Sequence, residues 1–272
     1  MAQRPRKQKY PPAGPPREGE TGQPVRIKYQ IKAKNLTQDL YLKSLREMQM
    51  TICGGPAGSG KTYLVTAIAL EKLLENKVEK IVVTRPVVEA GEHLGFLPGT
   101  FEEKLDPYLL PLIDAFEDHI GPAMTKRLIE TGKIVIAPLA FMRGRTFNKC
   151  FVILDEAQNS TVDQMRMFVT RMGYESVFAI NGDVSQSDLV KPRDAGKDWE
   201  NGLQFIVRKL KGRDEKISYI EFQNRDVVRS EMVKRILSLL DAPEYKNTSR
   251  SLNGAAVREV IDGTEVAALH QA

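Results

Sequence analysis

Short apolar runs alternate with longer amphipathic segments along most of the chain, which is the pattern of strands separated by helices. Six runs predict strands: Met50–Gly54, Lys80–Thr84, Lys133–Ala137, Cys150–Leu154, Ser176–Asn181 and Lys216–Phe222. Strands that alternate with helices predict an α/β domain with a mostly parallel sheet, covered by helices on both faces. In such a fold, ligands bind at the C-terminal ends of the strands.

Three segments between or after these runs carry apolar residues at helical spacing. Their apolar positions are Val65, Ile68, Ala69 and Leu73 in the first, Met165, Phe168, Val169 and Met172 in the second, and Val233, Ile236, Leu237 and Leu240 in the third. Ser160 and Asp163 are placed as a cap for the second helix.

Composition and charge divide the chain into a folded body and two tails. Of the 272 residues, 42% are hydrophobic, which is enough to bury a substantial core and excludes global disorder. Residues 1–26 are rich in proline and carry six basic side chains against two acidic ones. They predict a disordered basic arm, which either holds phosphates or only solubilises the protein. We expect one folded domain at 27–246 and a flexible tail at 247–272.

Several classes of protein are disfavoured by the composition. No run approaches the roughly 20 apolar residues of a membrane span. The N-terminus has no apolar segment behind its positive charges and so does not read as a secretory signal. Cys53 and Cys150 lie in separate apolar runs and are predicted to be buried small hydrophobic side chains. A cytoplasmic protein without a membrane partner fits best.

The residues after the first predicted strand match G-x-x-x-x-G-K-[ST] in full: Gly55, Pro56, Ala57, Gly58, Ser59, Gly60, Lys61 and Thr62. Glycines let successive N–H groups point at a phosphate, and the helix that follows directs its positive end at the same anion. Lys61 is predicted to reach the β- and γ-phosphates, and Thr62 to hold Mg²⁺. With Tyr63 as a neighbouring contact, this loop predicts ATP and Mg²⁺ as ligands.

An apolar strand that ends in two carboxylates is the partner that a phosphate loop needs. Asp155 is predicted to orient a Mg²⁺-bound water, and Glu156 to polarise the attacking water. The alternative is a charge pair at the start of the next helix. Beside an intact phosphate loop, hydrolysis is the favoured interpretation.

The next predicted strand ends in Gly182-Asp183-Val184-Ser185-Gln186. A polar residue at this position can contact the γ-phosphate or its water, so Gln186 is the candidate sensor and Asp183 its support. Taken alone, this is a common turn composition.

With these motifs in order, the chain resembles the PhoH family of phosphate-starvation-inducible ATPases, and its core resembles the RecA-like motor domain of superfamily-one helicases. The resemblance spans about Ala33 to Leu240. It is carried by Asn35-x-x-Gln38-x-x-Tyr41, Gly55–Thr62, Thr84–Glu92, Leu94–Gly99, Pro138–Thr146, Asp155–Asn159, Thr170–Gly173, Gly182–Gln186 and Asp226–Arg229.

The resemblance implies two further roles. Gln38 occupies the place where helicase-like ATPases read adenine; without that context it would be an ordinary exposed helix residue. Arg85 follows the second strand, where superfamily-one helicases hold a nucleic-acid strand. The alternative for Arg85 is a structural ion pair with Glu89 or Glu92.

A single RecA-like domain supplies half of an ATP site, because a cation must neutralise the charge that spreads over the transferring phosphoryl group. The sequence therefore predicts a closed homo-oligomeric ring, with a hexamer as the expected form. Arg145, Arg171 and Arg229 are the candidate arginine fingers, and the sequence does not choose among them.

The leading functional hypothesis is ATP hydrolysis coupled to binding or remodelling of RNA or single-stranded nucleic acid. An assembly or regulatory ATPase that acts on protein partners is the alternative, and single-stranded RNA would stimulate only the first. A small-molecule kinase is a third interpretation, against which Glu156 argues.

Overall fold

The computed structural model of the chain describes residues 27–28, 31–87, 101–189, 199–228, 232 and 235, with the side chains of 101–108 left out. The elements below all lie in the unit formed by residues 1–229. The predicted arm at 1–26, the tail at 247–272, the motif residues 88–99 and the named positions of the third helix lie outside the described residues.

Six parallel strands form one sheet in the order β3-β2-β4-β5-β1-β6. Their bounds are β1 Met50–Gly54, β2 Lys80–Arg85, β3 Ile134–Pro138, β4 Cys150–Leu154, β5 Val177–Gly182 and β6 Ile217–Glu221. All six predicted strands are confirmed, to within one residue at each end. The strands β1 and β4 are buried at every position, so they read as continuous apolar runs rather than alternating ones.

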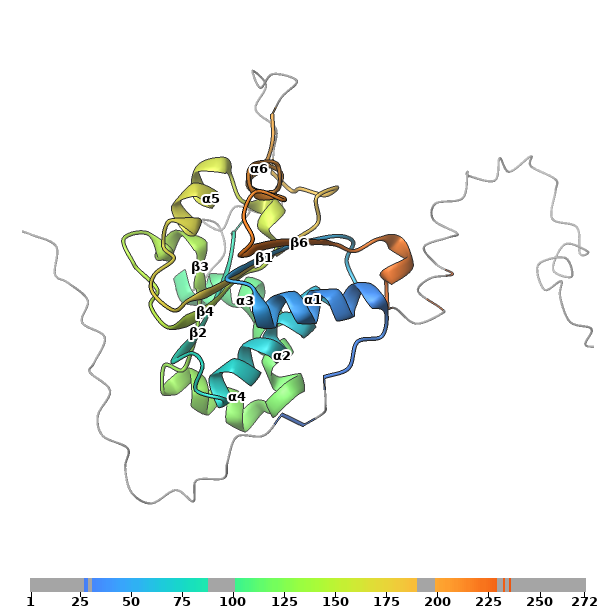
Figure 1. Ribbon diagram of the computed structural model, residues 1–272. Coiled ribbons are helices and arrows are strands. Elements are labelled where there is room, and N and C mark those ends of the chain that lie inside the picture. Colours follow the sequence, from blue (N-terminus) through green and yellow to red (C-terminus); the bar gives the residue numbers. More distant parts are fainter. Residues whose placement is uncertain are drawn as a thin grey trace, which may run out of the picture. The chain divides into compact units, whose positions relative to one another are not determined.

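Four helices pack against one face of the sheet, and α1, α2 and α4 are seen below it in Figure 1. Their bounds are α1 Leu36–Glu47, α2 Lys61–Leu74, α3 Phe101–Ile120 and α4 Pro122–Glu130. The predicted apolar face of α2 is confirmed, since all four of its named residues are buried. None of the described helices is long and apolar enough to cross a membrane.

The other face is covered by α5 (Val162–Val169), α6 (Gly202–Leu210) and the 3-10 turns η2 (Leu139–Met142) and η3 (Ala157–Asn159). Figure 1 shows α5 and α6 above the sheet. The buried side chains of this layer include Phe147, Phe168, Phe178 and Leu203. Both cysteines are buried free thiols as predicted, Cys53 in the first core and Cys150 in the second.

The predicted cap of α5 is wrong. Thr161 is the N-cap, and it forms a capping box with Gln164. The Ser160 hydroxyl instead donates to the Ala157 carbonyl and closes the preceding turn η3. The helix ends at Val169, so Met172 lies beyond it and forms an isolated bridge with Phe147.

The architecture gathers the predicted motifs at one edge of the sheet. Because all strands are parallel, the chain leaves β1, β2, β4 and β5 at the same edge, where the phosphate loop and the acidic pair begin. The short turn η4 (Asn224–Asp226) follows β6 at this edge as well.

Candidate functional site

The loop between β1 and α2 has the backbone of an anion site. Gly58 and Gly60 have φ values of 82° and 90°, in the left-handed region that glycine adopts without strain. Gly60 is the N-cap of α2 and makes no side-chain capping bond, and the first turn of the helix holds no acidic residue. The N–H groups at the start of α2 are therefore not satisfied by a side-chain cap and suit a phosphate.

Gly55 is required by close packing as well as by its backbone conformation. Its φ is 137°, and a Cβ at this position would lie 2.6 Å from the Cβ and the carbonyl oxygen of Phe222. The Phe222 N–H donates to the Gly54 carbonyl at 2.8 Å, so the end of β6 is fixed against the loop. A side chain at position 55 would push these two segments apart.

The two halves of the predicted metal site meet. The Thr62 hydroxyl lies 3.1 and 3.2 Å from the two carboxylate oxygens of Asp155, although 93 residues separate them in the chain. A hydroxyl beside a carboxylate is the oxygen donor set that Mg²⁺ prefers. Lys61 lies beside them, with its ammonium donating to the carbonyls of Gly55 and Pro56 at 2.6 and 2.9 Å.

The environment of Asp155 disfavours its negative charge in the metal-free protein. Burial and, to a smaller extent, the negative charge of the neighbouring Glu156 raise the pKa of Asp155 to about 6, against the opposing effects of Arg85, Thr62 and Lys61. A cation would offset this penalty directly. The shift and its position at the strand edge are characteristic of a functional carboxylate.

Glu156 is held in a strained position by two neighbours. Its backbone is left-handed, at φ 51° and ψ 42°, a conformation that an ordinary side chain adopts only at a cost of about 1–3 kcal/mol. One carboxylate oxygen lies 3.2 Å from the Arg85 guanidinium, and the other accepts from the Gln158 amide at 2.6 Å. These contacts fix the carboxylate next to Asp155.

Gln158 connects Glu156 with the segment after β5. Its amide oxygen accepts from the Asp183 N–H at 3.0 Å, while its nitrogen donates to Glu156. Asp183 is buried and accepts from the Ser185 backbone and hydroxyl. Gln186 is exposed in the same turn, and its backbone N–H donates to the Asp183 carbonyl at 3.3 Å. The structure thus joins Asp183 to the acidic pair, and its proposed sensor role with Gln186 stays a prediction.

Gln38 is buried against the phosphate loop, so the alternative of an exposed helix residue is wrong. Its amide nitrogen donates to the Ser59 carbonyl at 3.0 Å, and its oxygen accepts from the Lys34 N–H at 2.8 Å. Contact with adenine stays a prediction. Tyr63 is partly exposed in the first turn of α2, and its ring packs on His119 with centroids 4.2 Å apart.

Arg85 is paired within the site. Its guanidinium lies 3.2 Å from a carboxylate oxygen of Glu156. The alternative ion pair with Glu89 or Glu92 lies outside the described residues and stays a prediction. The role of Arg85 in nucleic-acid binding stays a prediction, and the ion pair gives it a direct connection to the predicted catalytic carboxylate.

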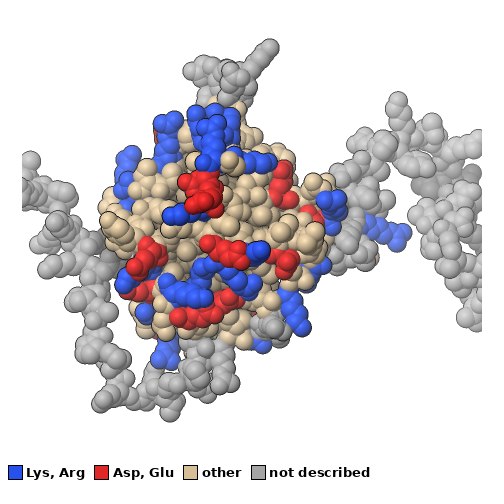
Figure 2. Space-filling view, in the orientation of Figure 1, with Lys and Arg blue, Asp and Glu red and all other residues tan. Residues whose placement is uncertain are grey.

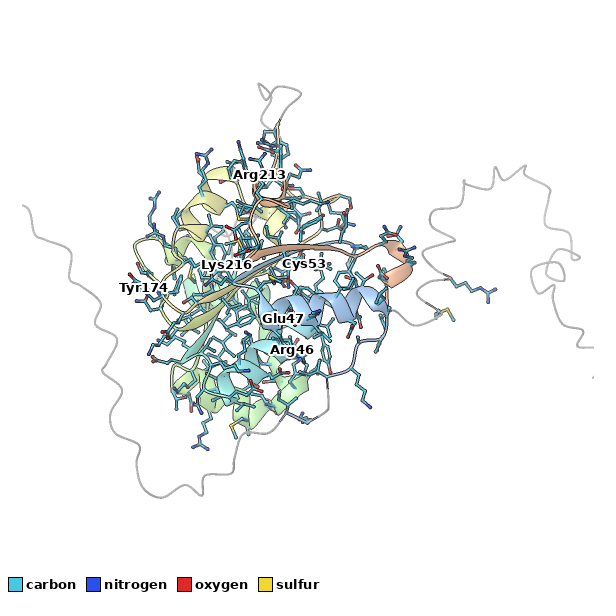
Figure 3. The ribbon with its side chains drawn as sticks, viewed as in Figure 1. Arg46, Glu47, Cys53, Tyr174, Arg213 and Lys216 are labelled. Atoms are coloured by element: carbon cyan, nitrogen blue, oxygen red, sulfur yellow. The ribbon has the colours of Figure 1, made fainter. Side chains whose placement is uncertain are left out.

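Arg145 and Arg171 lie together, away from the phosphate loop of their own chain. Arg171 lies in the segment between α5 and β5. Its guanidinium donates to the carbonyls of Met167 and Arg145, at 3.1 and 3.4 Å. Tyr174 follows on that segment, and Figure 3 shows it at the margin of the molecule, well away from Cys53 near the loop end of β1.

Arg229 lies outside the described residues, but the residue before it reaches the site. The Val228 N–H donates to the Gly58 carbonyl at 2.9 Å. The Asn35 side chain, which caps α1, also donates to the Asp226 carbonyl. The segment after β6 therefore borders the phosphate loop.

Three residues at the site were not assigned a role from the sequence: Gln158, Tyr41 and Asn181. The Tyr41 hydroxyl donates to the Asn181 amide oxygen at 2.6 Å, across 140 residues of chain. Tyr41 and Gln158 belong to the motifs that carry the family resemblance, and this membership could have indicated a role in the site. For Asn181, the only indication in the sequence is that a polar residue ends an apolar strand.

The parallel sheet, the glycine loop and the acidic strand end define a nucleotide-binding protein of the phosphate-loop ATPase class, with the RecA-like fold that the sequence predicted. The family model described as PhoH-like protein matches residues 30–241. The chain belongs to the PhoH family.

Relatives agree with this assignment. The PhoH-like protein of Bacillus subtilis (strain 168) is 48% identical over 211 residues, which cover 78% of this chain and 64% of the relative. Protein PhoH of Escherichia coli (strain K12) is 42% identical over 209 residues, which cover 76% of this chain and 57% of the relative. The chain thus spans less than two thirds of the length of these relatives.

Two solved structures are similar at low sequence identity. The large terminase from a thermophilic bacteriophage has a TM-score of 0.45 and 11% identity, covering 79% of this chain and 51% of the terminase. The UvsW helicase from bacteriophage T4 has a TM-score of 0.43 and 14% identity, and the match covers 73% of this chain and 64% of the helicase.

Proposed function

We propose that this protein is a Mg²⁺-dependent ATPase whose hydrolysis is coupled to single-stranded nucleic acid, with RNA as the preferred strand. The observation that carries the ATPase proposal is the contact of Thr62 with both oxygens of Asp155, beside the N-terminus of α2 and next to Glu156. A binding loop alone would need no second carboxylate at this point.

Each residue has a defined task in the proposed reaction. The start of α2 and Lys61 bind and neutralise the β- and γ-phosphates, while Thr62 and Asp155 would hold the metal. Mg²⁺, when bound, supplies charge neutralisation at the phosphoryl oxygens. Glu156 orients the attacking water, and Gln158 keeps its carboxylate in place through the 2.6 Å hydrogen bond.

Arg85 supports the coupling to nucleic acid. It lies at the end of β2, where the family resemblance expects a bound strand, and it also forms the 3.2 Å ion pair with Glu156. A phosphate group that attracts the guanidinium would weaken this pair and free the carboxylate to orient water. Basic side chains also gather at the top of Figure 2, where Figure 1 places α6. The end of α6 and the turn after it carry the exposed residues Arg208, Lys209, Lys211 and Arg213.

The test is steady-state ATPase measurement on the full chain with and without single-stranded RNA. Lys61→Ala is expected to lose nucleotide affinity, whereas Glu156→Gln binds ATP and fails to turn it over. Arg85→Ala is expected to raise the unstimulated rate and to remove most of the response to RNA. Arg46→Ala is the matched control, because Arg46 forms a two-bond ion pair with Glu71 on the outer side of α1 and α2.

The outcomes separate the possible functions. RNA stimulation that survives in Arg85→Ala would place the strand elsewhere. An ATPase that ignores RNA and single-stranded DNA alike would favour an assembly or regulatory ATPase acting on protein partners. A protein that releases no phosphate from ATP would overturn the whole proposal.

A further inference from the structure

The side chains of Asp155, Asn181 and Cys53 lie in a row across three neighbouring strands, at the edge of the sheet that carries the phosphate loop. Leu154 of β4 is in register with Ile180 of β5, so Asp155 and Asn181, the next residues, are neighbours on adjacent parallel strands. Asn181 is in turn in register with Cys53 of β1. Since side chains at equivalent positions of parallel strands project to the same face, all three project toward the layer of α1 and α2.

Tyr41 of α1 is completely buried and donates its hydroxyl to the Asn181 amide oxygen at 2.6 Å. Burial is the main reason why the pKa of Tyr41 is raised well above its ordinary value, and the neighbouring Cys53 and Asp155 add to the shift. The hydroxyl therefore stays protonated and acts as the donor. This fixes the orientation of the Asn181 amide, with its oxygen toward α1 and its nitrogen away from it.

The nitrogen of that amide has no hydrogen-bond partner among the described residues, although it is buried and Asn181 has no exposed surface. A buried N–H donor without an acceptor destabilises a protein by about 1–3 kcal/mol, so such groups are uncommon and call for an explanation. The neighbouring group in the row is a carboxylate, which accepts hydrogen bonds only.

We propose that Tyr41 and Asn181 are a positioning pair for Asp155: the Asn181 amide nitrogen donates to the carboxylate when it binds the metal, and Tyr41 holds the amide in the required orientation. This inference rests on the proposed Mg²⁺ role of Asp155. Partners of this kind orient a metal ligand and favour its ionised form.

The pair also connects the metal ligand with the helix that contacts the phosphate loop. Gln38 and Tyr41 are three residues apart on α1 and therefore project from the same face of the helix. Gln38 donates to the Ser59 carbonyl of the loop, and Tyr41 to the residue beside Asp155. A displacement of α1 would consequently move the contacts with the phosphate loop and with the residue beside Asp155 at the same time.

The test measures metal dependence by nucleotide binding rather than by turnover. A fluorescent ATP analogue is titrated into the full chain at increasing Mg²⁺, and again in EDTA. We expect Tyr41→Phe and Asn181→Leu to need about 10–100-fold more Mg²⁺ for tight binding, with the affinity in EDTA unchanged. The double variant should lose little more than either single one, because the two side chains act as one unit.

Ser44→Ala is the matched control. Ser44 is buried on the same helix and its hydroxyl is hydrogen-bonded to that of Thr51 in β1 at 2.9 Å, so the variant removes one buried contact between α1 and the sheet without touching the metal ligand. It should keep the wild-type Mg²⁺ dependence.

Two negative results have different meanings. If Asp155→Asn shifts the Mg²⁺ dependence and Tyr41→Phe does not, the positioning pair is refuted and the ATPase proposal stands. If Asp155→Asn shifts nothing either, the metal role of Asp155 fails and both proposals fall. A loss of affinity in EDTA that equals the loss in Mg²⁺ would show a structural role only.

Discussion

At the scale of single residues, the site concentrates strain and buried charge in two adjacent carboxylates. Asp155 is buried with a raised pKa, and Glu156 adopts a left-handed backbone conformation. Neither arrangement favours the folded metal-free chain. Such local penalties are common where binding or catalysis needs a pre-arranged group.

Asp155→Asn should therefore stabilise the metal-free protein while abolishing ATP turnover. The folded state binds the Asp155 proton more tightly than the unfolded chain, whose ordinary pKa is about 3.9. Unfolding consequently releases a proton between about pH 4 and the folded pKa of about 6, and the contribution of Asp155 to stability falls as pH rises through that window. We expect the unfolding free energy of Asp155→Asn to exceed that of the wild type by about 1–3 kcal/mol at pH 8, and by almost nothing at pH 4.

Urea unfolding in EDTA at both pH values checks this. Glu47→Gln is the control, since Glu47 is exposed at the end of α1 and should leave the unfolding free energy nearly unchanged. An Asp155→Asn variant that is less stable than wild type at pH 8 would contradict the argument.

At the scale of elements, the end of β6 and the phosphate loop act as one packed unit. The Cβ of an alanine at position 55 would meet Phe222 at 2.6 Å in addition to the strain of its positive φ. We expect Gly55→Ala to lower the unfolding free energy by about 2–4 kcal/mol, from left-handed strain plus overpacking, and to weaken ATP binding.

The measurement is thermal or urea unfolding together with nucleotide titration. Gly132→Ala is the matched control, because Gly132 has a φ of 69° with open space around it. It should show the backbone strain alone, about 1–2 kcal/mol. Equal losses in the two variants would mean that the contact with Phe222 is unimportant.

The strands and the two principal motifs were predictable because each is encoded within a few consecutive residues. Parallel strands buried on both faces read as unbroken apolar runs, and the loop and the acidic pair follow two of them directly. The helix α3 was not predicted: its sequence contains Pro107 and Pro111, which ordinarily argue against a helix interior. The cap of α5 was misplaced by one residue, because Ser160 and Thr161 are both suitable caps.

The contacts within the site could not be predicted, because they depend on the strand order. The strand β5 lies between β4 and β1, which places Asn181 beside Asp155 and Asp183 within reach of Gln158. Nothing in the local sequence specifies this order. The pairing of Arg85 with Glu156 likewise follows from β2 lying next to β4.

At the scale of the whole molecule, we predict that the arginine finger comes from another subunit of a ring. Arg145 and Arg171 contact each other near the start of β5 rather than their own phosphate loop, and Arg229 follows a residue that borders the loop. Alanine at the correct arginine should lower turnover about 10³-fold or more without weakening ATP binding.

Mixing two inactive variants tests the transfer between subunits. Lys61→Ala combined with the finger variant should restore up to about a quarter of the wild-type rate, because random assembly pairs an intact loop with an intact arginine at that frequency. If the alanine variants of all three arginines fail to recover activity with Lys61→Ala, and the protein sediments as a monomer, the ring is excluded.

The burial of Cys53 has a practical consequence. This thiol has no exposed surface, and burial raises its pKa, so a maleimide or disulfide reagent can modify it only after β1 and α1 separate. Because Cys53 lies in the same row as Asp155 and Asn181, its labelling rate reports how often this particular edge of the sheet opens. Bound nucleotide should slow the labelling of Cys53. The native thiol therefore reports the opening of this edge of the sheet without an engineered label.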